Sequence, residues 1–180
     1  CNINKQSLNY LQCSDPILVS SAALCLSNLA SNAINHESLK ATGSFDEMEI
    51  FLSRRERELK LRALSFIRGL SASSIMRNQL IRPKMTNTLL EFATVEDVEI
   101  QIEAIAAICN LSLSGNIGSN PHSFLNGIQM NNLISFLCSA DSVSRLFGAL
   151  VIGNIASESE LQDAIVESGA MDPLIRTAKI

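Results

Sequence analysis

Aromatic residues are scarce in this chain: it has no tryptophan and one tyrosine, and aromatic residues make up only 4% of its 180 residues. Hydrophobic residues nevertheless make up 47%, mostly as leucine, isoleucine, alanine and valine. A β-sandwich core usually relies on aromatic and β-branched residues, whereas this composition favours helices. We therefore expect an all-α protein, long enough for one domain or several small repeats around a real core.

Charge is also sparse, and it has the wrong sign for binding a phosphate backbone. Charged residues make up 18% of the chain, and 14 Lys and Arg against 18 Asp and Glu give a formal net charge of -4. Proteins that wrap nucleic acid usually carry a basic patch. The sequence therefore argues against nucleic acid as the main partner.

The motifs of common enzymes and metal sites are missing. The chain contains no G-x-x-x-x-G-K-[ST] phosphate loop, no G-x-G-x-x-G and no G-x-S-x-G nucleophile elbow. The two histidines, His36 and His122, have no Cys, Asp or Glu at metal-ligand spacing. We expect no catalytic residue, no cofactor, no metal and no enzymatic activity in this chain.

The cysteines indicate a reducing compartment. The chain contains no C-x-x-C pair, and its five widely spaced cysteines are Cys1, Cys13, Cys25, Cys109 and Cys138. Such thiols are typical of cytosolic or nuclear proteins, and no secretory signal opens the chain. We expect a cytoplasmic protein.

No segment is predicted to insert into a membrane. Residues 104–140 carry no Asp, Glu, Lys or Arg, but asparagine, serine, glycine and proline interrupt this stretch. Because the chain starts at Cys1 and stops inside an apolar helical pattern, we expect a piece of a longer array. A lipid anchor outside these residues would place the protein at the cytosolic face of a membrane.

The strongest signal is an internal repeat. Residues 22–30, 63–71, 104–112 and 148–156 align with one another, and the matched positions Asn28, Gly69, Asn110 and Asn154 lie 41, 41 and 44 residues apart. A period of this length indicates a solenoid, in which each repeat packs only against its neighbours.

Each aligned segment has the pattern of a helix with one buried face. A small residue (Ala22, Ala63, Ala104 or Gly148) is followed four residues later by an aliphatic residue, and three residues later by another. These offsets place the three side chains on one face of a helix. The small residue allows another helix to approach closely, so we expect a shared core that is built once per repeat.

A second pattern recurs between these helices. In residues 164–175 a short helix is expected to end at Gly169, in a left-handed cap, and another is expected to start near Pro173. Earlier copies surround Gly43 and Gly127, and in the copy between them Pro83 is expected to stop the helix instead. We therefore expect three helices in each repeat.

These residues carry a family resemblance. The A-x-x-x-L-x-N-L pattern of the long helices and the G-A-x-x-P-L turn at 169–174 resemble armadillo-repeat proteins along nearly the whole chain. The resemblance implies a right-handed α-solenoid with three helices per repeat and about four repeats. We place one domain at 1–180, divided into a partial repeat 1–33, repeats 34–74, 75–115 and 116–158, and a partial repeat 159–180. HEAT repeats are the alternative, but their two-helix units do not need this turn.

Two positions depart from the family pattern. Gly69 replaces the asparagine of the second long helix, and the third repeat carries extra residues at 115–121. We expect this insertion to be an exposed excursion.

The resemblance also implies a binding surface. In armadillo proteins the third helices line a concave groove, and a ladder of asparagines pins the main chain of an extended peptide. That role would pass to Asn28, Asn110 and Asn154; alternatively these amides are solvated or bond within their own helix. Leu24, Leu61, Ile102, Leu146 and Leu150 lie one or two turns before the ladder, where they either anchor a partner or pack against the next repeat.

Basic peptides are not the expected ligand. Import receptors of the importin-α type resemble this groove but carry a tryptophan array, which this chain lacks, and we expect acidic residues to be scarce along the same edge. The groove is expected to be neutral and apolar, and suited to an amphipathic helix or a segment with Leu or Phe.

One dense charged run spans residues 54–62. Its mixed signs favour pairs within the helix on a solvated face. The alternative is a partner-facing basic rim that includes Arg68, next to Gly69. Acidic residues from Glu96 to Glu103 are expected to balance the dipole of a third helix.

Taken with the resemblance, these features predict a non-catalytic scaffold or adaptor that binds a protein or peptide partner. Residues 153–170 are most similar to membrane-tethered adaptors, such as the yeast vacuolar armadillo protein and the armadillo-repeats-only protein of apicomplexan parasites. Two alternatives are a regulatory armadillo region of a larger enzyme, of the ubiquitin ligase or NAD hydrolase type, and self-assembly through the open ends of the array.

Overall fold

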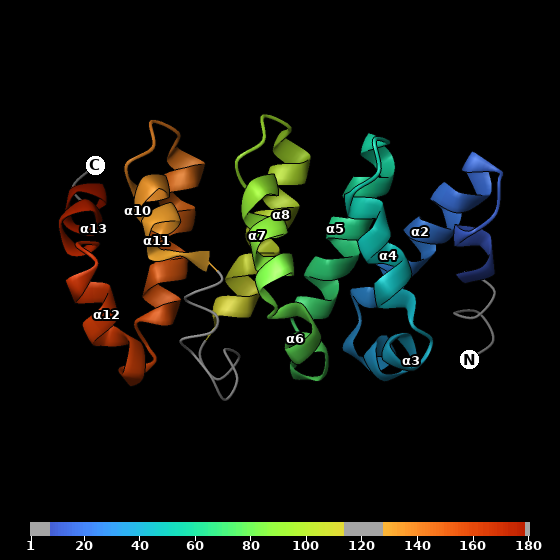
Figure 1. Cartoon of the computed structure of the whole chain (residues 1–180), viewed down its shortest axis with the longest axis horizontal. Coiled ribbons are helices and arrows are strands. Elements are labelled where there is room, and N and C mark those ends of the chain that lie inside the picture. The colour runs from blue at the N-terminus through green and yellow to red at the C-terminus, as the bar shows by residue number, and fades with distance from the viewer. Residues whose placement is uncertain (1–7, 114–127, 179–180) are drawn as a thin grey trace.

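A computed structural model describes residues 8–113 and 128–178. In these two ranges every regular element is a helix, as the composition predicts. The helices follow one another in a row from one end of the molecule to the other (Figure 1). The insertion predicted at 115–121 lies outside the described residues.

The helices repeat in three kinds. The long third helices are α2 (Pro16–Ala30), α5 (Arg57–Ser71), α8 (Val98–Ser112) and α11 (Ser142–Ile155). The second helices are α4 (Ser44–Leu52), α7 (Pro83–Phe92), α10 (Met130–Leu137) and α13 (Met171–Thr177). The short first helices are α3 (His36–Ala41), α6 (Ser74–Leu80) and α12 (Gln162–Glu167), with 3-10 turns η1 (Ala33–Asn35) and η2 (Ser159–Leu161) before α3 and α12.

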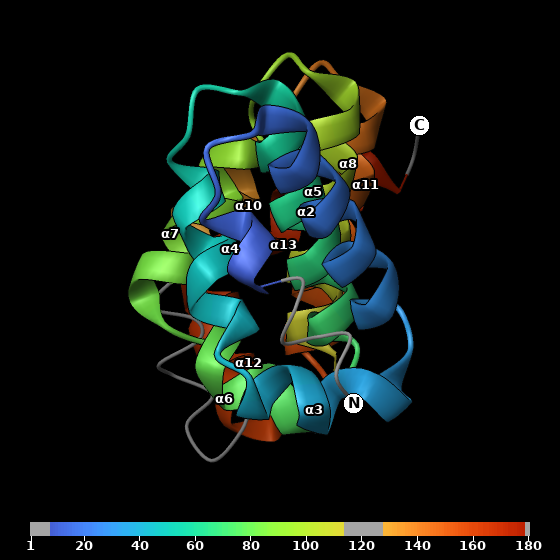
Figure 2. The ribbon, with the colours of Figure 1, turned by 90° about the vertical axis from the view of Figure 1, so that its right-hand side faces the viewer.

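These helices form two layers. Viewed along the array, the third helices lie on one side, the second helices on the other, and the first helices close one end (Figure 2). The third helices α5, α8 and α11 each pack against the second helix of their own repeat, and α5 also packs against α2 and α8. Residues about forty positions apart in the sequence therefore lie side by side.

The third helices α2, α8 and α11 begin at an aspartate whose side chain caps the helix. Asp15, Asp97 and Asp141 each accept a hydrogen bond from a backbone N–H of the first turn. The predicted core face is confirmed: Ala63, Ala104 and the aliphatic residues after them are fully buried. Each buried aliphatic side chain contributes about 1.5 to 3 kcal/mol.

The turn between the first and second helices is confirmed in part. Gly43 and Gly169 have φ of 72° and 79°, the left-handed conformation expected of a glycine cap. The two prolines act differently from the prediction. Pro83 occupies the first turn of α7, and α6 has already ended at Leu80; α13 starts at Met171, two residues before Pro173. A proline fits the first turn because its missing N–H would have no partner there.

One predicted repeat boundary lies inside an α-helix, and another, between residues 33 and 34, lies inside the 3-10 turn η1. The division between residues 74 and 75 falls after the first residue of α6, which begins at Ser74. The serine at 73 caps that helix by accepting a hydrogen bond from the N–H of Ile75, so Ser74 is already helical.

The departure at Gly69 has a steric cause. A Cβ atom at this position would lie 2.6 Å from the carbonyl oxygen of Ala30, at the end of the preceding third helix. A contact this short with backbone cannot be relieved by a side-chain rotation, so α5 approaches α2 closely only with glycine here.

This contact gives a prediction for Gly69→Ala. The added methyl group should force α5 away from α2 and lower the free energy of unfolding by about 1 to 3 kcal/mol. Urea denaturation measures the loss. Gly153→Ala is the matched control, because a Cβ there meets nothing within 4 Å; in the exposed interior of α11 it should be neutral or stabilising. Equal effects of the two substitutions would contradict the packing described here.

Candidate functional site

The candidate site is the outward surface of α2, α5, α8 and α11, called here the third-helix face. All nine predicted partner-binding residues lie on these helices. They are Leu24, Asn28, Leu61, Arg68, Ile102, Asn110, Leu146, Leu150 and Asn154. Their places on the surface differ, and their role in binding stays a prediction.

The aliphatic members of this set are mostly exposed and so do not belong to the core. Ile102 is 50% exposed, Leu146 58% and Leu150 49%, whereas Leu24 is 38% exposed and Leu61 is half-buried. On α8 and α11, sequence reasoning missed Val98 and Val143, which are 62% and 46% exposed; on α2 it missed Ile17, which is 76% exposed. The sequence could have revealed Val98 and Val143, because they lie about one helical turn before Ile102 and Leu146. We call Val98, Ile102, Val143, Leu146 and Leu150 the apolar patch.

The ladder asparagines bind the preceding repeat. The side-chain amide of Asn110 donates to Ser71 Oγ at 3.0 Å and to the carbonyl oxygen of Arg68 at 3.3 Å. Asn154 repeats this arrangement one helix later, with donor distances of 3.0 Å to Ser112 Oγ and 3.4 Å to the carbonyl oxygen of Cys109. The sequence suggested as alternatives that these amides are solvated or bond within their own helix. Neither alternative describes Asn110 and Asn154, because their amides join neighbouring repeats.

The asparagine and its serine partner occur together. Ser71 and Ser112 lie two residues after a ladder position, and each faces an asparagine on the next third helix. On α2 the matching residue is Ala30, and the next ladder position is Gly69, which packs directly against Ala30. The first junction thus replaces a hydrogen bond with close backbone packing.

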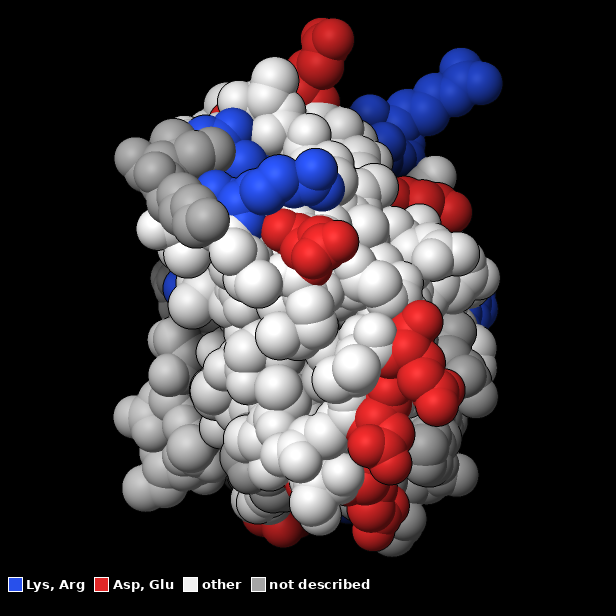
Figure 3. All heavy atoms as spheres, turned by 90° about the vertical axis from the view of Figure 1, so that its left-hand side faces the viewer, with Lys and Arg blue, Asp and Glu red and all other residues white. Residues whose placement is uncertain are grey.

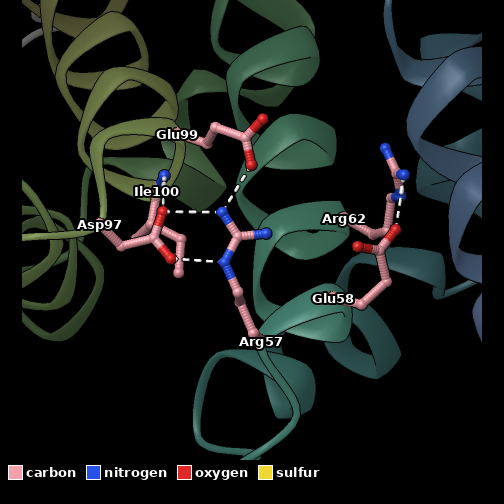
Figure 4. A network of polar contacts seen from close by, with 6 residues as sticks. All are labelled: Arg57, Glu58, Arg62, Asp97, Glu99 and Ile100. Atoms are coloured by element: carbon pink, nitrogen blue, oxygen red, sulfur yellow. Dashed lines mark hydrogen bonds and ion pairs between the residues drawn. The ribbon is translucent and has the colours of Figure 1, made fainter.

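One residue of the charged run, Arg57, forms ion pairs across the α5–α8 junction. Arg57 Nε lies 2.5 Å from Asp97 Oδ2, and Arg57 Nη2 lies 2.9 Å from Asp97 Oδ1 and 2.5 Å from Glu99 Oε2 (Figure 4). The side-chain hydrogen bond from Arg57 holds the pKa of Asp97 below its usual range, and the same bond raises the pKa of Arg57 above its ordinary value. Asp97 is therefore an anion that is already paired.

Two more arginines complete the pairing. Arg62 pairs with Glu58 on the same helix at 2.5 Å, the intrahelical contact that the sequence predicts (Figure 4). Arg68, predicted as a partner contact, pairs with Glu103 of α8 at 2.6 Å. The expectation of pairs within the helix is therefore wrong for Arg57.

Acidic residues are also less scarce on this edge than expected. A hollow of about 290 Å³ between α5 and α8 is lined by Leu61, Arg62, Ser65, Glu99, Ile102 and Glu103. Glu99 and Glu103 flank Ile102 along α8, so the helical repeat brings them to the same edge. Because each of them pairs with an arginine of α5, the hollow offers little uncompensated charge.

A second apolar surface lies at the α12–α13 end of the array. Val166 is 61% exposed, Met171 44% and Ile175 49%. Most of this end carries no charge, and acidic side chains form a band along one edge (Figure 3). Met171 occupies the same position in its repeat as Phe45 does in an earlier repeat. Phe45 is only 5% exposed, and the third helix of its repeat, α5, is among the described helices. This end therefore has the composition of a surface between helices of one repeat.

Neither a metal-ligand cluster nor a single membrane-spanning helix is found in the part of the chain that the structure describes. Within it, no group of three His, Cys, Asp or Glu is placed to hold a metal. Burial raises the pKa of the Cys109 thiol to about 11, so this thiol stays protonated at neutral pH. Across the same residues, no single helix has the length and apolarity to cross a membrane; one pair, Pro16–Ala30 with Ala33–Ala41, passes on length and composition but is bent by 109°.

Several solved structures with the same architecture are designed proteins. Designed armadillo repeat protein YIII(Dq)4CqI superimposes with a TM-score of 0.81 at 22% identity, over 96% of this chain and 73% of that one. The chain has the armadillo-repeat fold. Designed protein YIII(Dq.V1)4CPAF in complex with the peptide (KR)4 also gives 0.81, at 21% identity over 96% of this chain and 72% of that one.

A third armadillo structure, from computationally designed proteins for modular peptide recognition, matches with a TM-score of 0.80 at 22% identity, over 96% of this chain and 73% of the other. No protein-family model matches the sequence, and no curated protein matches it. At this level of identity the likeness establishes the armadillo fold. The ligand has to be argued from the surface.

The inter-repeat amides give a second prediction. Asn154→Ala should remove the bond to Ser112 and cost about 0.5 to 1.5 kcal/mol in urea unfolding. In a double-mutant cycle, Ser112→Ala should lose most of its effect once Asn154 is gone. Asn28→Ala is the control, because Asn28 is exposed on α2 and the described residues show no such bond for it. If Asn28→Ala lowered the free energy of unfolding as much as Asn154→Ala, this would contradict the conclusion that Asn154 stabilises the contact between neighbouring repeats.

The pairing of Asp97 gives a pH prediction. Because its pKa in the folded protein is lowered, its contribution to stability is present above the ordinary Asp pKa and is lost as the pH falls through the folded-state value. In Arg57→Met, an NMR titration should show the pKa of Asp97 rising, although the backbone hydrogen bond from Ile100 keeps part of the depression. Arg62→Met should leave Asp97 unchanged. No rise in the Arg57 variant would contradict the assignment.

Proposed function

We propose that this chain is a non-catalytic interaction scaffold that holds a segment of a protein partner on its third-helix face. The observation that carries the proposal is the apolar patch on α8 and α11, in which residues of about half exposure lie at helical spacing on two neighbouring helices. Soluble proteins usually keep contiguous apolar surface of this kind for a partner.

Two further observations support this function. Designed proteins of the same fold recognise peptides, and one of them is described in complex with (KR)4. In this chain, the side chains that hold the scaffold together are already engaged with one another: Asn110, Asn154, Arg57 and Arg68 all bind a neighbouring repeat. The side chains of the patch remain exposed for a partner.

The proposed compartment is the cytoplasm. Cys13, Cys109 and Cys138 are present as free thiols, as is usual in a reducing environment. An adaptor tethered to the cytosolic face of a membrane by a segment outside these residues is compatible with the same surface.

Affinity capture from cell lysate, with mass spectrometry to identify partners, tests the proposal. Leu150→Arg should remove the specific partners, because it places a charge in the middle of the patch. Its circular dichroism and melting temperature should stay close to those of the unsubstituted protein, because Leu150 is 49% exposed.

Val166→Arg is the matched control, since Val166 is an exposed aliphatic residue of α12, outside the third-helix face. It should retain the partners. If the partners still bind the Leu150→Arg variant, the binding surface lies elsewhere on the protein. A large fall in the melting temperature of this variant would show that Leu150 belongs to the core.

A further inference from the structure

The α5–α8 junction is held by polar contacts at both ends of the two helices. Near their N-terminal ends, Arg57 pairs with Asp97 and Glu99 (Figure 4). Near their C-terminal ends, Asn110 donates to Ser71 Oγ at 3.0 Å, and a further ion pair lies between these two points. These helices therefore cannot separate at either end without losing a polar contact.

The α8–α11 junction is held near one end only. Asn154 donates to Ser112 Oγ at 3.0 Å and to the carbonyl oxygen of Cys109 at 3.4 Å, near the C-terminal ends of the helices. Among the described residues, no ion pair or hydrogen bond joins the N-terminal halves of α8 and α11. The two helices also pack less extensively than α5 does with α2 or with α8. Their N-terminal halves are therefore free to separate about the contacts of Asn154.

The repeat register explains this difference. Counted back from the ladder position of each helix, Val98 has the place of Arg57, and Val143 has the place of Glu99. The capping aspartate is kept, as Asp141. The α8–α11 junction therefore has a carboxylate at its N-terminal end but no arginine on α8 to reach it.

The layer of second helices shows the same asymmetry. Glu49 of α4 pairs with Arg82 and Lys84, which lie at the start of α7, at 3.3 Å each. In the part of the chain that the structure describes, α7 and α10 share no ion pair or hydrogen bond. In both layers, the described residues after 127 are thus tied to those before 114 by fewer polar contacts than join the two preceding repeats.

The α2–α5 junction also lacks an ion pair within the described ranges, but it is held in another way. Gly69 packs directly against the backbone of Ala30, and the contact between α2 and α5 is more extensive than that between α8 and α11. Opening this junction would lose van der Waals contact along the helices. Bending is therefore expected at α8–α11 rather than at α2–α5.

We infer that the array bends at the α8–α11 junction, with the contacts of Asn154 as the pivot and the N-terminal ends of the two helices as the parts that move. Residues 8–113 and 128–178 then behave as two blocks joined by a hinge. The apolar patch spans both blocks, because two of its residues lie on α8 and three on α11. Bending therefore changes the shape of the patch. The motion belongs to the free chain, so the inference does not depend on the proposed function.

Double electron–electron resonance measures this motion in the free protein. The spin labels are attached to p-acetylphenylalanine, because the chain already contains five cysteines. One pair of labels, at Thr94 and Ile175, spans the α8–α11 junction, and the control pair, at Ile17 and Thr94, lies within the first block. All three positions are exposed, and circular dichroism verifies that each labelled protein is folded.

A charged pair built into the junction supplies the missing contact. Val98→Arg with Val143→Glu copies the ion pair of the α5–α8 junction. The added carboxylate is needed because Arg145 already acts on Asp141 from the same helix. Val98→Met with Val143→Gln is the matched control, since it adds side chains of similar length without charge.

The inference predicts that the distances between Thr94 and Ile175 are spread at least about twice as broadly as those between Ile17 and Thr94. The charged pair should narrow the first distribution toward the width of the second, and the uncharged control should leave it broad. Equal widths in the unsubstituted protein would overturn the inference. A broad distribution that the charged pair does not narrow would overturn it as well, because the missing contact would then not be what permits the motion.

Discussion

The close approach of neighbouring third helices is the constraint on which the rest of this structure depends. The long helices α5 and α8 each bury their inward face against the second helix of their own repeat and against both neighbouring long helices, so neither repeat completes its core alone. The approach is so tight at the first junction that only glycine fits at position 69, against the carbonyl of Ala30. At the later junctions the same gap is bridged by an asparagine that reaches a serine.

Stacking at this distance determines what the outward surface can do. In the described part of the chain, ion pairs join α5 to α8 through Arg57 and Arg68, and none joins α8 to α11. The charged side chains Asp97, Glu99 and Glu103 of this half are thereby held by arginines of α5. The other half is left apolar, with Ile102, Leu146 and Leu150 exposed. One array thus presents two surfaces with different chemistry, although every repeat has the same fold.

The sequence predicted what local periodicity encodes. The repeat, the buried face with Ala63 and Ala104, and the left-handed cap at Gly169 follow from spacing within one helix or turn, and all are confirmed. The partners of Asn110, Asn154, Arg57 and Arg68 lie 35 to 45 residues away. Helix periodicity says which residues face a neighbour but not which rotamer reaches which atom. For the same reason the carboxylates of α8 could be located on the exposed edge only once the helices were placed.

The account's central claim is that α8 and α11 form the working surface. Hydrogen exchange measured by mass spectrometry, with and without a captured partner, tests it most directly, because protection reports contact on every helix at once. The account predicts that added protection is concentrated in α8 and α11 and is small in α4, α7 and α10. Protection centred on the second helices, or on α12 and α13, would contradict it.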